Sequence, residues 1–235
     1  MALRGDQLGE AEAGDERFAR RSLPVWMVTL LITVASAIVA AAIGLAVSSI
    51  LQARTLLGTK LSPATPAANF TLKDATTGQT LSLASFKGKV VSLTFLYTHC
   101  PDVCPLIAGT LGQADQELGS ARNKVEMLAV SVDPHGDTPQ TVRAFDQAHG
   151  LTFSNWHYFI GTAQQLVPVW RAYYVGSDAA EAPSAAGKVS KATPQLINHT
   201  AIVYLIDPQG RLRIALDANF TVSEFIHDVK ALSSS

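Results

Sequence analysis

A long uncharged segment near the N-terminus places the strongest constraint on how this chain can fold. No charged residue occurs between Arg21 and Arg54, and residues 25–51 are almost all apolar or small. About 20 apolar residues are enough to cross the hydrocarbon core of a bilayer as a helix, so we predict a transmembrane anchor at residues 24–51. A cleaved signal peptide is the alternative, because Ala35-Ser36-Ala37 resembles a cleavage site. The apolar core of a signal peptide usually extends over only about 7–15 residues, so the longer segment favours an anchor that is retained.

The charges that flank this segment predict its orientation. Three arginines lie within residues 17–21, whereas only Arg54 and Lys60 follow the segment closely. Basic residues concentrate on the cytoplasmic side of membrane spans, so we expect residues 1–23 to form a cytoplasmic tail. Because no mitochondrial presequence is recognisable, we expect the inner membrane of a bacterium, with the C-terminal domain in the periplasm. The formal net charge of −1 argues against nucleic acid as a partner.

The remaining chain divides into a linker and one domain. Residues 52–68 are rich in small residues and proline, so we expect a linker there and a folded domain over residues 69–235. Residues 176–192 are rich in Ala, Ser and Gly and predict a mobile excursion. The order of the predicted elements is typical of a thioredoxin-like fold, an α/β fold with a central mixed sheet flanked by helices. Hydrophobic periodicity predicts these elements in turn: a hairpin at 70–83, a strand at 90–97, a helix at 107–118, a strand at 125–132, a helix at 138–150, a strand at 156–160, a helix at 163–174, a hairpin at 200–216 and a helix at 222–232.

The chain contains two cysteines, Cys100 and Cys104, and they stand between a predicted buried strand and a predicted helix. Pro105 suits the first position of a helix, which puts Cys104 at or just before that position. The partial positive charge of a helix N-terminus favours a thiolate, so we expect the pKa of Cys104 to be lowered. Three residues separate the cysteines, one more than in thioredoxin-type oxidoreductases. This spacing permits a disulfide, and it also leaves room for a soft metal, because thiolates bind Cu(I), zinc and iron–sulfur clusters.

Two sulfurs are too few ligands for most of these metals, so a third donor is needed. Of the six histidines, His99 and His199 have a plausible route to the cysteines. His99 adjoins Cys100, but neighbouring residues of a strand point to opposite faces. His199 begins the late hairpin, which lies close to the cysteine corner in a thioredoxin-like sheet, so it is the better candidate. Taken alone, His199 is more simply explained as an ordinary strand histidine.

Other polar residues are explained more simply by structure than by chemistry. Asp133 and Asp137 could bind a cation, but a turn at the end of a strand and the approach to a helix cap account for both. The remaining histidines are expected at the surface or in side-chain packing: His135, His149, His157 and His227.

Three blocks of sequence carry a family resemblance. They are Thr98-His99-Cys100-Pro101-Asp102-Val103-Cys104-Pro105, then Ser131-Val132-Asp133-Pro134 with Asp137-Thr138-Pro139, and finally His199-Thr200 with Tyr204-Leu205-Ile206-Asp207-Pro208. Together they resemble the SCO/SenC proteins, membrane-anchored copper-binding proteins of cytochrome c oxidase assembly, over residues 68–232.

The resemblance implies a copper site and its purpose. It implies that Cys100, Cys104 and His199 hold Cu(I) or Cu(II) for transfer to the dinuclear copper site of cytochrome c oxidase. The implied partners are the copper-bearing subunit of that oxidase and other copper chaperones. One departure is Asn198, because many members carry aspartate before the histidine. Asparagine lacks the negative charge of aspartate, so we expect a weaker contact to a metal ligand or to a partner protein at this position. The three implied ligands are all still present.

Two function classes follow from these residues. A metallochaperone, which is not an enzyme, passes copper on by ligand exchange and needs all three ligands. A thiol–disulfide oxidoreductase would keep cysteines of the oxidase copper site, or of another exported protein, reduced, and it needs Cys100 and Cys104 but not His199. A peroxiredoxin-type peroxidase is disfavoured, because Thr98 lies only two residues before Cys100 and no arginine follows nearby.

Overall fold

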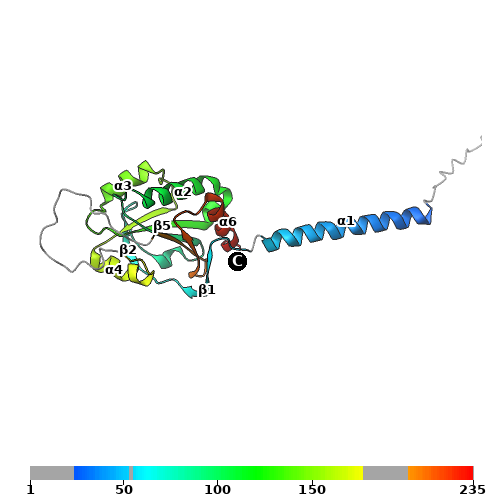
Figure 1. Ribbon diagram of the computed structural model, residues 1–235, viewed down its shortest axis with the longest axis horizontal. Helices are drawn as coiled ribbons and strands as arrows, with labels where there is room; N and C mark the ends of the chain where they lie inside the picture. The colour runs from blue at the N-terminus through cyan, green and yellow to red at the C-terminus, as the bar shows by residue number, and fades with distance from the viewer. Residues whose placement is uncertain (1–23, 53–54, 177–200, 235) are drawn as a thin grey trace, which may run out of the picture. The chain divides into compact units, whose positions relative to one another are not determined.

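The chain forms two compact units, residues 1–50 and residues 51–235. The computed structural model describes residues 24–52, 55–176 and 201–234 (Figure 1). The first unit holds most of helix α1 (Val25–Gln52). Residues 25–45 of this helix have a mean hydropathy of 2.4 and are long and apolar enough to cross a membrane. The predicted N-terminal apolar helix is therefore confirmed.

The second unit is built on one mixed sheet of eight strands. Strand β4 pairs in parallel with β5, which pairs in parallel with β6, whereas the neighbouring pairs at both edges are antiparallel. The central mixed sheet that the sequence predicts is confirmed. From one edge to the other, the strands are β1 (Thr59–Pro66), β8 (Arg211–Asp217), β7 (Ile202–Ile206), β4 (Val90–Leu96), β5 (Val125–Ser131), β6 (Trp156–Ile160), β2 (Thr71–Asp74) and β3 (Thr80–Ser82).

Helices cover both faces of the sheet, which is why the two central strands could be predicted from sequence. Every residue of β4 and β5 is buried, as expected for parallel strands with helices on both sides. Figure 1 shows α2 and α3 along one side of the sheet and α4 on the other. The ring contacts agree, because Phe145 of α3 packs against Tyr158 of β6, whereas Tyr173 beyond α4 packs against Phe95 of β4. The helices are α2 (Val103–Glu117), α3 (Pro139–Ala148), α4 (Ala163–Ala172) and α6 (Val222–Leu232), with short 3₁₀ helices η1 (Leu83–Phe86) and η2 (Gly119–Lys124).

Residues 59–66, which we expected to belong to a linker, instead form the edge strand β1. This strand pairs with β8 in an antiparallel register that shifts between Lys60 and Thr65. A strand at the edge of a sheet has hydrogen-bonding neighbours on one side only, so it tolerates Pro63 and Pro66. The expected boundary at residue 69 is therefore wrong, because the folded domain already includes β1.

The chain is also fastened to the domain immediately before β1. The buried carboxylate of Asp228 on α6 accepts hydrogen bonds from the backbone N–H groups of Leu57 (2.8 Å) and Gly58 (2.9 Å). A side chain at Gly58 would not fit, because its Cβ would lie 2.4 Å from the Ile214 side chain and 2.5 Å from that of Leu216. A glycine at this position allows the backbone to approach α6 and β8 closely.

A buried ionic cluster joins β2, β5 and β6. The Nδ1 atom of His157 lies 2.9 Å from the Asp74 carboxylate, and its Nε2 atom lies 3.3 Å from the Glu126 carboxylate, which also pairs with Lys89. Burial by itself lowers the pKa of His157, but hydrogen bonds to Asp74 and Glu126 outweigh burial and raise that pKa to about 9. His157 is thus a buried cation, and the sequence analysis, which placed it at the surface or in packing, did not predict its ion pairs.

This cluster predicts that the domain loses stability in alkaline solution. Because the folded pKa of His157 is raised, its stabilisation is fully present below pH 6.5 and is lost as the pH rises through 9. The pKa of His157 rises from 6.5 to about 9, and one pKa unit corresponds to about 1.36 kcal/mol, so we expect a loss of about 3 kcal/mol in the free energy of unfolding. Urea denaturation at a series of pH values measures this loss.

The His157→Gln variant provides the control for this measurement. It should be less stable near neutral pH and should lack most of the decline. Burial raises the pKa of Asp146 to about 7. The stability that depends on protonated Asp146 is therefore lost mainly near and below pH 7, at the lower end of the pH range in which His157 loses its proton. A decline that persists unchanged in His157→Gln would show that His157 does not cause it.

Candidate metal centre

The two cysteines lie where β4 turns into α2. Strand β4 ends at Leu96, and the turn that follows is closed by a hydrogen bond from the N–H of Cys100 to the carbonyl of Tyr97 (3.2 Å). Helix α2 begins at Val103, so Cys104 is its second residue. The helix therefore starts one or two residues earlier than Pro105 led us to expect. This is possible because the N–H groups of the first helical turn have no partner within the helix, and proline is tolerated throughout that turn.

Both sulfurs are buried at the first turn of α2. Cys100 is 8% exposed and Cys104 is fully buried. The backbone N–H of Cys104 donates a hydrogen bond to Cys100 Sγ over 3.4 Å. The turn thus folds the first cysteine over the N-terminus of the helix that carries the second.

The electrostatics of this corner differ from our expectation. The pKa of Cys104 is raised, first by its hydrogen bond with Cys100 and then by burial, and the nearby charge of Asp137 acts in the same direction. The prediction that the helix N-terminus lowers the pKa of Cys104 is therefore wrong. A helix N-terminus stabilises a thiolate by a modest amount, and complete burial beside a second sulfur and a carboxylate outweighs it.

Asp137 anchors the turn that carries Cys100. Its Oδ1 atom accepts hydrogen bonds from the N–H (2.9 Å) and the hydroxyl (2.8 Å) of Thr98. Its Oδ2 atom accepts from the hydroxyls of Ser131 (2.6 Å) and Tyr158 (3.0 Å). Burial raises the pKa of Asp137. We expected a residue near a helix cap, and the structure shows a buried acceptor that ties the cysteine turn to β5 and β6.

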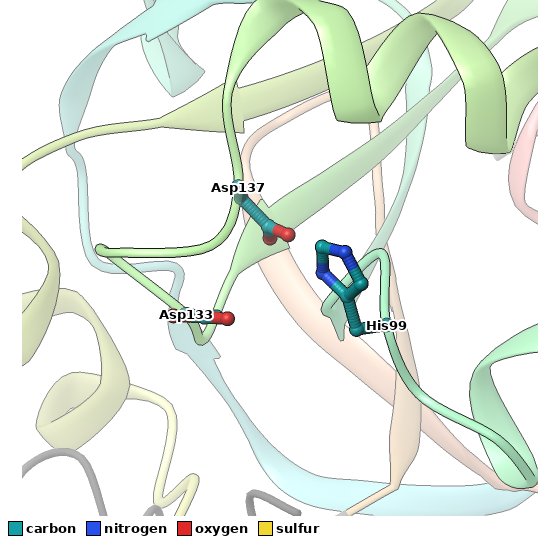
Figure 2. A group of neighbouring side chains, drawn as sticks. All are labelled: His99, Asp133 and Asp137. Carbon is teal, nitrogen blue, oxygen red and sulfur yellow. The ribbon is translucent and has the colours of Figure 1, made fainter. Parts of the chain in front are cut away.

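Asp133 has a similar structural role in the turn after β5. Its Oδ1 atom accepts from the backbone N–H groups of His135 (3.1 Å) and Gly136 (2.8 Å). Figure 2 shows the imidazole of His99 with one edge turned toward the carboxylates of Asp133 and Asp137, and ligand atoms of the three residues lie within 4.8 Å of one another. Each carboxylate oxygen of Asp137 already accepts two hydrogen bonds, so these three residues are not a ready set of metal ligands.

That His99 is not a joint ligand with the cysteines stays a prediction, and the reason that we gave for it, strand alternation, does not hold. Residues 97–101 form a turn and not a strand, so strand alternation does not decide where His99 points. Cys100 is buried whereas His99 is exposed. The two neighbours therefore diverge because the turn directs one side chain inward and the other outward.

His199 and Asn198 lie outside the described residues, and so does most of the expected excursion at 176–192. The described chain resumes just before β7, which pairs with β4 in antiparallel fashion, so that Val203 lies opposite Thr94. The hydroxyl of Thr94 donates to the carbonyl of Ile202 (3.0 Å). The start of β7 is thus beside the end of β4 that leads to the cysteine turn.

The remaining aromatic and histidine residues fit structural roles. His135 is exposed, His149 packs on the ring of Phe145, and His227 Nδ1 lies 3.1 Å from the Asp228 carboxylate. Trp156 and Trp170 are buried in the core. These placements agree with the surface or packing roles predicted for these three histidines.

The fold and the cysteine corner define a thioredoxin-like domain that carries a dithiol where a central strand meets a helix. The chain belongs to the SCO1/SenC family, because a profile of that family, described as SCO1/SenC, matches residues 59–234. The family predicted from the three sequence blocks is therefore confirmed.

Individual relatives agree with this assignment. The protein SCO2, mitochondrial, of Saccharomyces cerevisiae is 30% identical over 148 residues, which cover 61% of this chain and 45% of the relative. The protein SenC of Rhodobacter capsulatus is 28% identical over 141 residues, which cover 57% of this chain and 55% of the relative. The chain thus spans about half the length of the curated relatives it matches.

Solved structures show the same fold. The copper-bound structure of Bradyrhizobium japonicum ScoI has 28% sequence identity and a TM-score of 0.59, and the match covers 71% of this chain and 99% of that one. Apo Sco1 from Thermus thermophilus has 26% identity and a TM-score of 0.63, and that match covers 76% and 98% of the two chains. The thioredoxin-like fold predicted for the domain is the fold of these Sco structures.

Proposed function

We propose that this protein is a copper chaperone that binds one copper ion and delivers it during the assembly of cytochrome c oxidase. The observation that supports this most directly is the contact between the N–H of Cys104 and Cys100 Sγ, which gathers two sulfurs at one helix turn. Thiolate ligands favour soft metals, and Cu(I) is one of them, together with zinc and iron–sulfur clusters. The ScoI relative has been solved with copper bound, and membership of the SCO1/SenC family links this chain to the same metal.

His199 completes the proposed site as the third ligand beside Cys100 and Cys104. The pairing of β7 with β4 supports this choice, because the chain enters β7 beside the end of β4. Delivery then requires ligand exchange only: sulfur ligands of the copper-bearing oxidase subunit replace the three chaperone ligands in turn. Copper is the cargo, and no bond of an organic substrate is broken.

Helix α1 supports a membrane location for this activity. The apolar span at residues 25–45 is long enough to be a bilayer anchor. We propose a single-pass protein of the bacterial inner membrane with residues 1–23 in the cytoplasm and the copper-binding domain in the periplasm. An anchored chaperone would remain at the membrane in which its acceptor is assembled.

Copper stoichiometry tests this function. The full chain, purified in detergent under reducing conditions and loaded with Cu(I), should retain about one copper per chain after gel filtration, as expected for one thiolate site. Atomic absorption measures the ratio of copper to protein. A ratio close to zero with both thiols reduced would rule out the chaperone function.

The same corner supports thiol–disulfide exchange as the alternative function. The two cysteines are close enough for the N–H of one to reach the sulfur of the other. Exchange begins with a thiolate, and copper binding needs thiolates as well, so the raised pKa of Cys104 favours neither function over the other. A copper-free protein that reduces oxidase cysteines, and does so equally well without His199, would favour this alternative over copper delivery.

A further inference from the structure

Basic side chains gather at the end of the sheet opposite to the cysteine turn. Lys89 and Lys124 immediately precede β4 and β5, and the first residues of these two parallel strands lie opposite each other. Strand β4 then runs away from this end and leads into the cysteine turn. These side chains belong to a basic end of the domain, which consists of Lys87, Lys89, Lys124, Arg211 and Arg213.

The turn between β7 and β8 lies at the same end as the lysines. The N–H of Gly88 donates a hydrogen bond to the carbonyl of Pro208 in this turn (3.0 Å), and a Cβ added at Gly210 would lie 3.9 Å from Cε of Lys87. Arg211 follows at the start of β8. The loop before β4 and the turn before β8 therefore share one surface.

The carboxylates that pair with these cations lie beneath them. Asp207 accepts a hydrogen bond from Nε of Arg211 (2.9 Å), and Glu126 pairs with Lys89. The side chains of Lys89 and Arg211 are 44% and 46% exposed, whereas those of Glu126 and Asp207 are 10% and 0% exposed. An approaching surface therefore meets the cations before it meets their partners.

Two of the lysines add positive charge without a paired carboxylate. Lys87 and Lys124 are exposed, and neither forms an ion pair with another residue in the described ranges. Glu117, an exposed carboxylate at the end of α2, accepts a hydrogen bond from Nε2 of Gln113 (3.0 Å). The basic end thus complements a surface of negative charge.

The proposed anchor keeps such a surface within reach of the basic end. Residues 46–56 join the apolar span, which ends at Leu45, to Leu57, whose N–H is held by Asp228. At about 3.3–3.6 Å per extended residue, this segment covers at most about 40 Å. A short tether raises the effective concentration of the bilayer surface at the domain. The modest attraction between basic side chains and anionic headgroups is then enough to orient the domain, an advantage that a soluble acidic protein lacks.

We propose that the basic end contacts the anionic phospholipid headgroups of the membrane that holds α1. The inference rests on the proposed membrane location and adds an orientation of the domain. The seven residues of β4 rise about 3.3 Å each, so this contact holds the cysteine turn about 20 Å above the headgroups. The cysteines are thereby presented to the aqueous compartment, where a copper-bearing partner can reach them.

Lysine acylation in nanodiscs tests this contact. The full chain is incorporated into discs of phosphatidylcholine with or without phosphatidylglycerol and is labelled briefly with uncharged N-hydroxysuccinimidyl acetate. Mass spectrometry measures the labelling of each lysine. Lys87 and Lys124 report on the basic end. Lys73 is the internal control, because it is exposed and pairs with Ile160 at the opposite end of the sheet.

We expect phosphatidylglycerol to lower the labelling of Lys87 and Lys124 about tenfold, since each basic side chain near an anionic surface strengthens binding by roughly a factor of five. The labelling of Lys73 should not change. Salt at about 1 M, which shortens the Debye length to about 3 Å, should restore the labelling. Equal labelling in both kinds of disc would overturn the proposal, and so would equal protection of Lys73 or protection that persists in salt.

The matched variants Lys87→Glu and Lys87→Arg show whether charge causes the protection. Lys87→Glu reverses one charge of the basic end, so Lys124 should regain most of its labelling in the anionic discs. Lys87→Arg keeps the charge and should leave Lys124 protected. Full protection of Lys124 in Lys87→Glu would contradict the contact.

The outcome of this experiment is independent of the copper test. No copper takes part in the labelling, so a failure of copper binding and a failure of the membrane contact are distinguishable. A chain that does not enter the discs would refute the proposed anchor and this contact together.

Discussion

Replacing Asp137 by alanine is expected to destabilise the domain by about 3–5 kcal/mol, because each buried polar group left without a partner costs about 1–3 kcal/mol. The carboxylate accepts two hydrogen bonds from Thr98 and one each from Ser131 and Tyr158. Alanine removes all four acceptor contacts and leaves a cavity beneath the cysteine turn. Urea denaturation, compared with the wild type at the same pH, measures the loss of stability.

The Asp137→Asn variant is the matched control. Its amide oxygen can still accept both bonds from Thr98, and its NH₂ group can donate to the hydroxyl oxygens of Ser131 and Tyr158. Burial already raises the pKa of this carboxyl group, so loss of the charge itself should cost little. We therefore expect Asp137→Asn to lose less stability than Asp137→Ala, because it keeps both bonds from Thr98 and only the hydroxyl hydrogens of Ser131 and Tyr158 lose their acceptor. An Asp137→Ala variant within about 1 kcal/mol of the wild type would contradict the anchoring role.

Copper binding should respond to the same substitution. Releasing the Thr98 backbone frees the turn that holds Cys100. Changes of partners that orient metal ligands typically lower metal affinity by about 10–100-fold. Asp137→Ala, if it is still folded, should therefore bind copper more weakly than Asp137→Asn does.

Strong local patterns explain what could be predicted from the sequence. The apolar stretches at β4 and β5 are continuous because helices cover both faces of the sheet. The helix predicted from residue 138 is α3, which begins at Pro139, and the hydroxyl of Thr138 caps it by accepting a hydrogen bond from the N–H of Thr141. The dithiol at the strand-to-helix corner follows from the same patterns, because a strand, a turn and a helix are all local features.

Long-range contacts explain most of what could not be predicted. Residues 59–66 have no hydrophobic alternation, and only their pairing with β8 makes them a strand. Asp74, Glu126 and His157 are far apart in the sequence, and no local pattern indicates that they meet. The raised pKa of Cys104 arises from burial beside Cys100 and Asp137. The role of Asp137 had a partial signal, since it belongs to one of the three blocks that identified the family.

Replacing His199 by alanine is expected to have the largest effect on the proposed site. Two sulfurs can still hold Cu(I), whereas Cu(II) prefers additional nitrogen or oxygen ligands in a tetragonal arrangement. Loss of a direct ligand should lower the copper affinity by more than the roughly 10–100-fold typical of an orienting partner. Cu(II) binding should therefore suffer far more than Cu(I) binding.

The His149→Ala variant is the control for the loss of copper affinity expected in His199→Ala. His149→Ala removes a histidine that packs on Phe145 near the cysteine turn. It should leave copper stoichiometry and affinity unchanged. A similar loss in both variants would point to general destabilisation instead of the removal of a ligand.

The Cu(II) absorption spectrum of the full chain, recorded for the wild type and for His199→Ala, tests the central claim most directly. For a site of Cys100, Cys104 and His199, the wild type should show intense sulfur-to-copper charge-transfer bands at about one copper per chain. These bands should disappear or change markedly in His199→Ala and persist in His149→Ala. Identical bands and affinity in the wild type and His199→Ala would show that His199 is not a ligand and would contradict the proposed copper site.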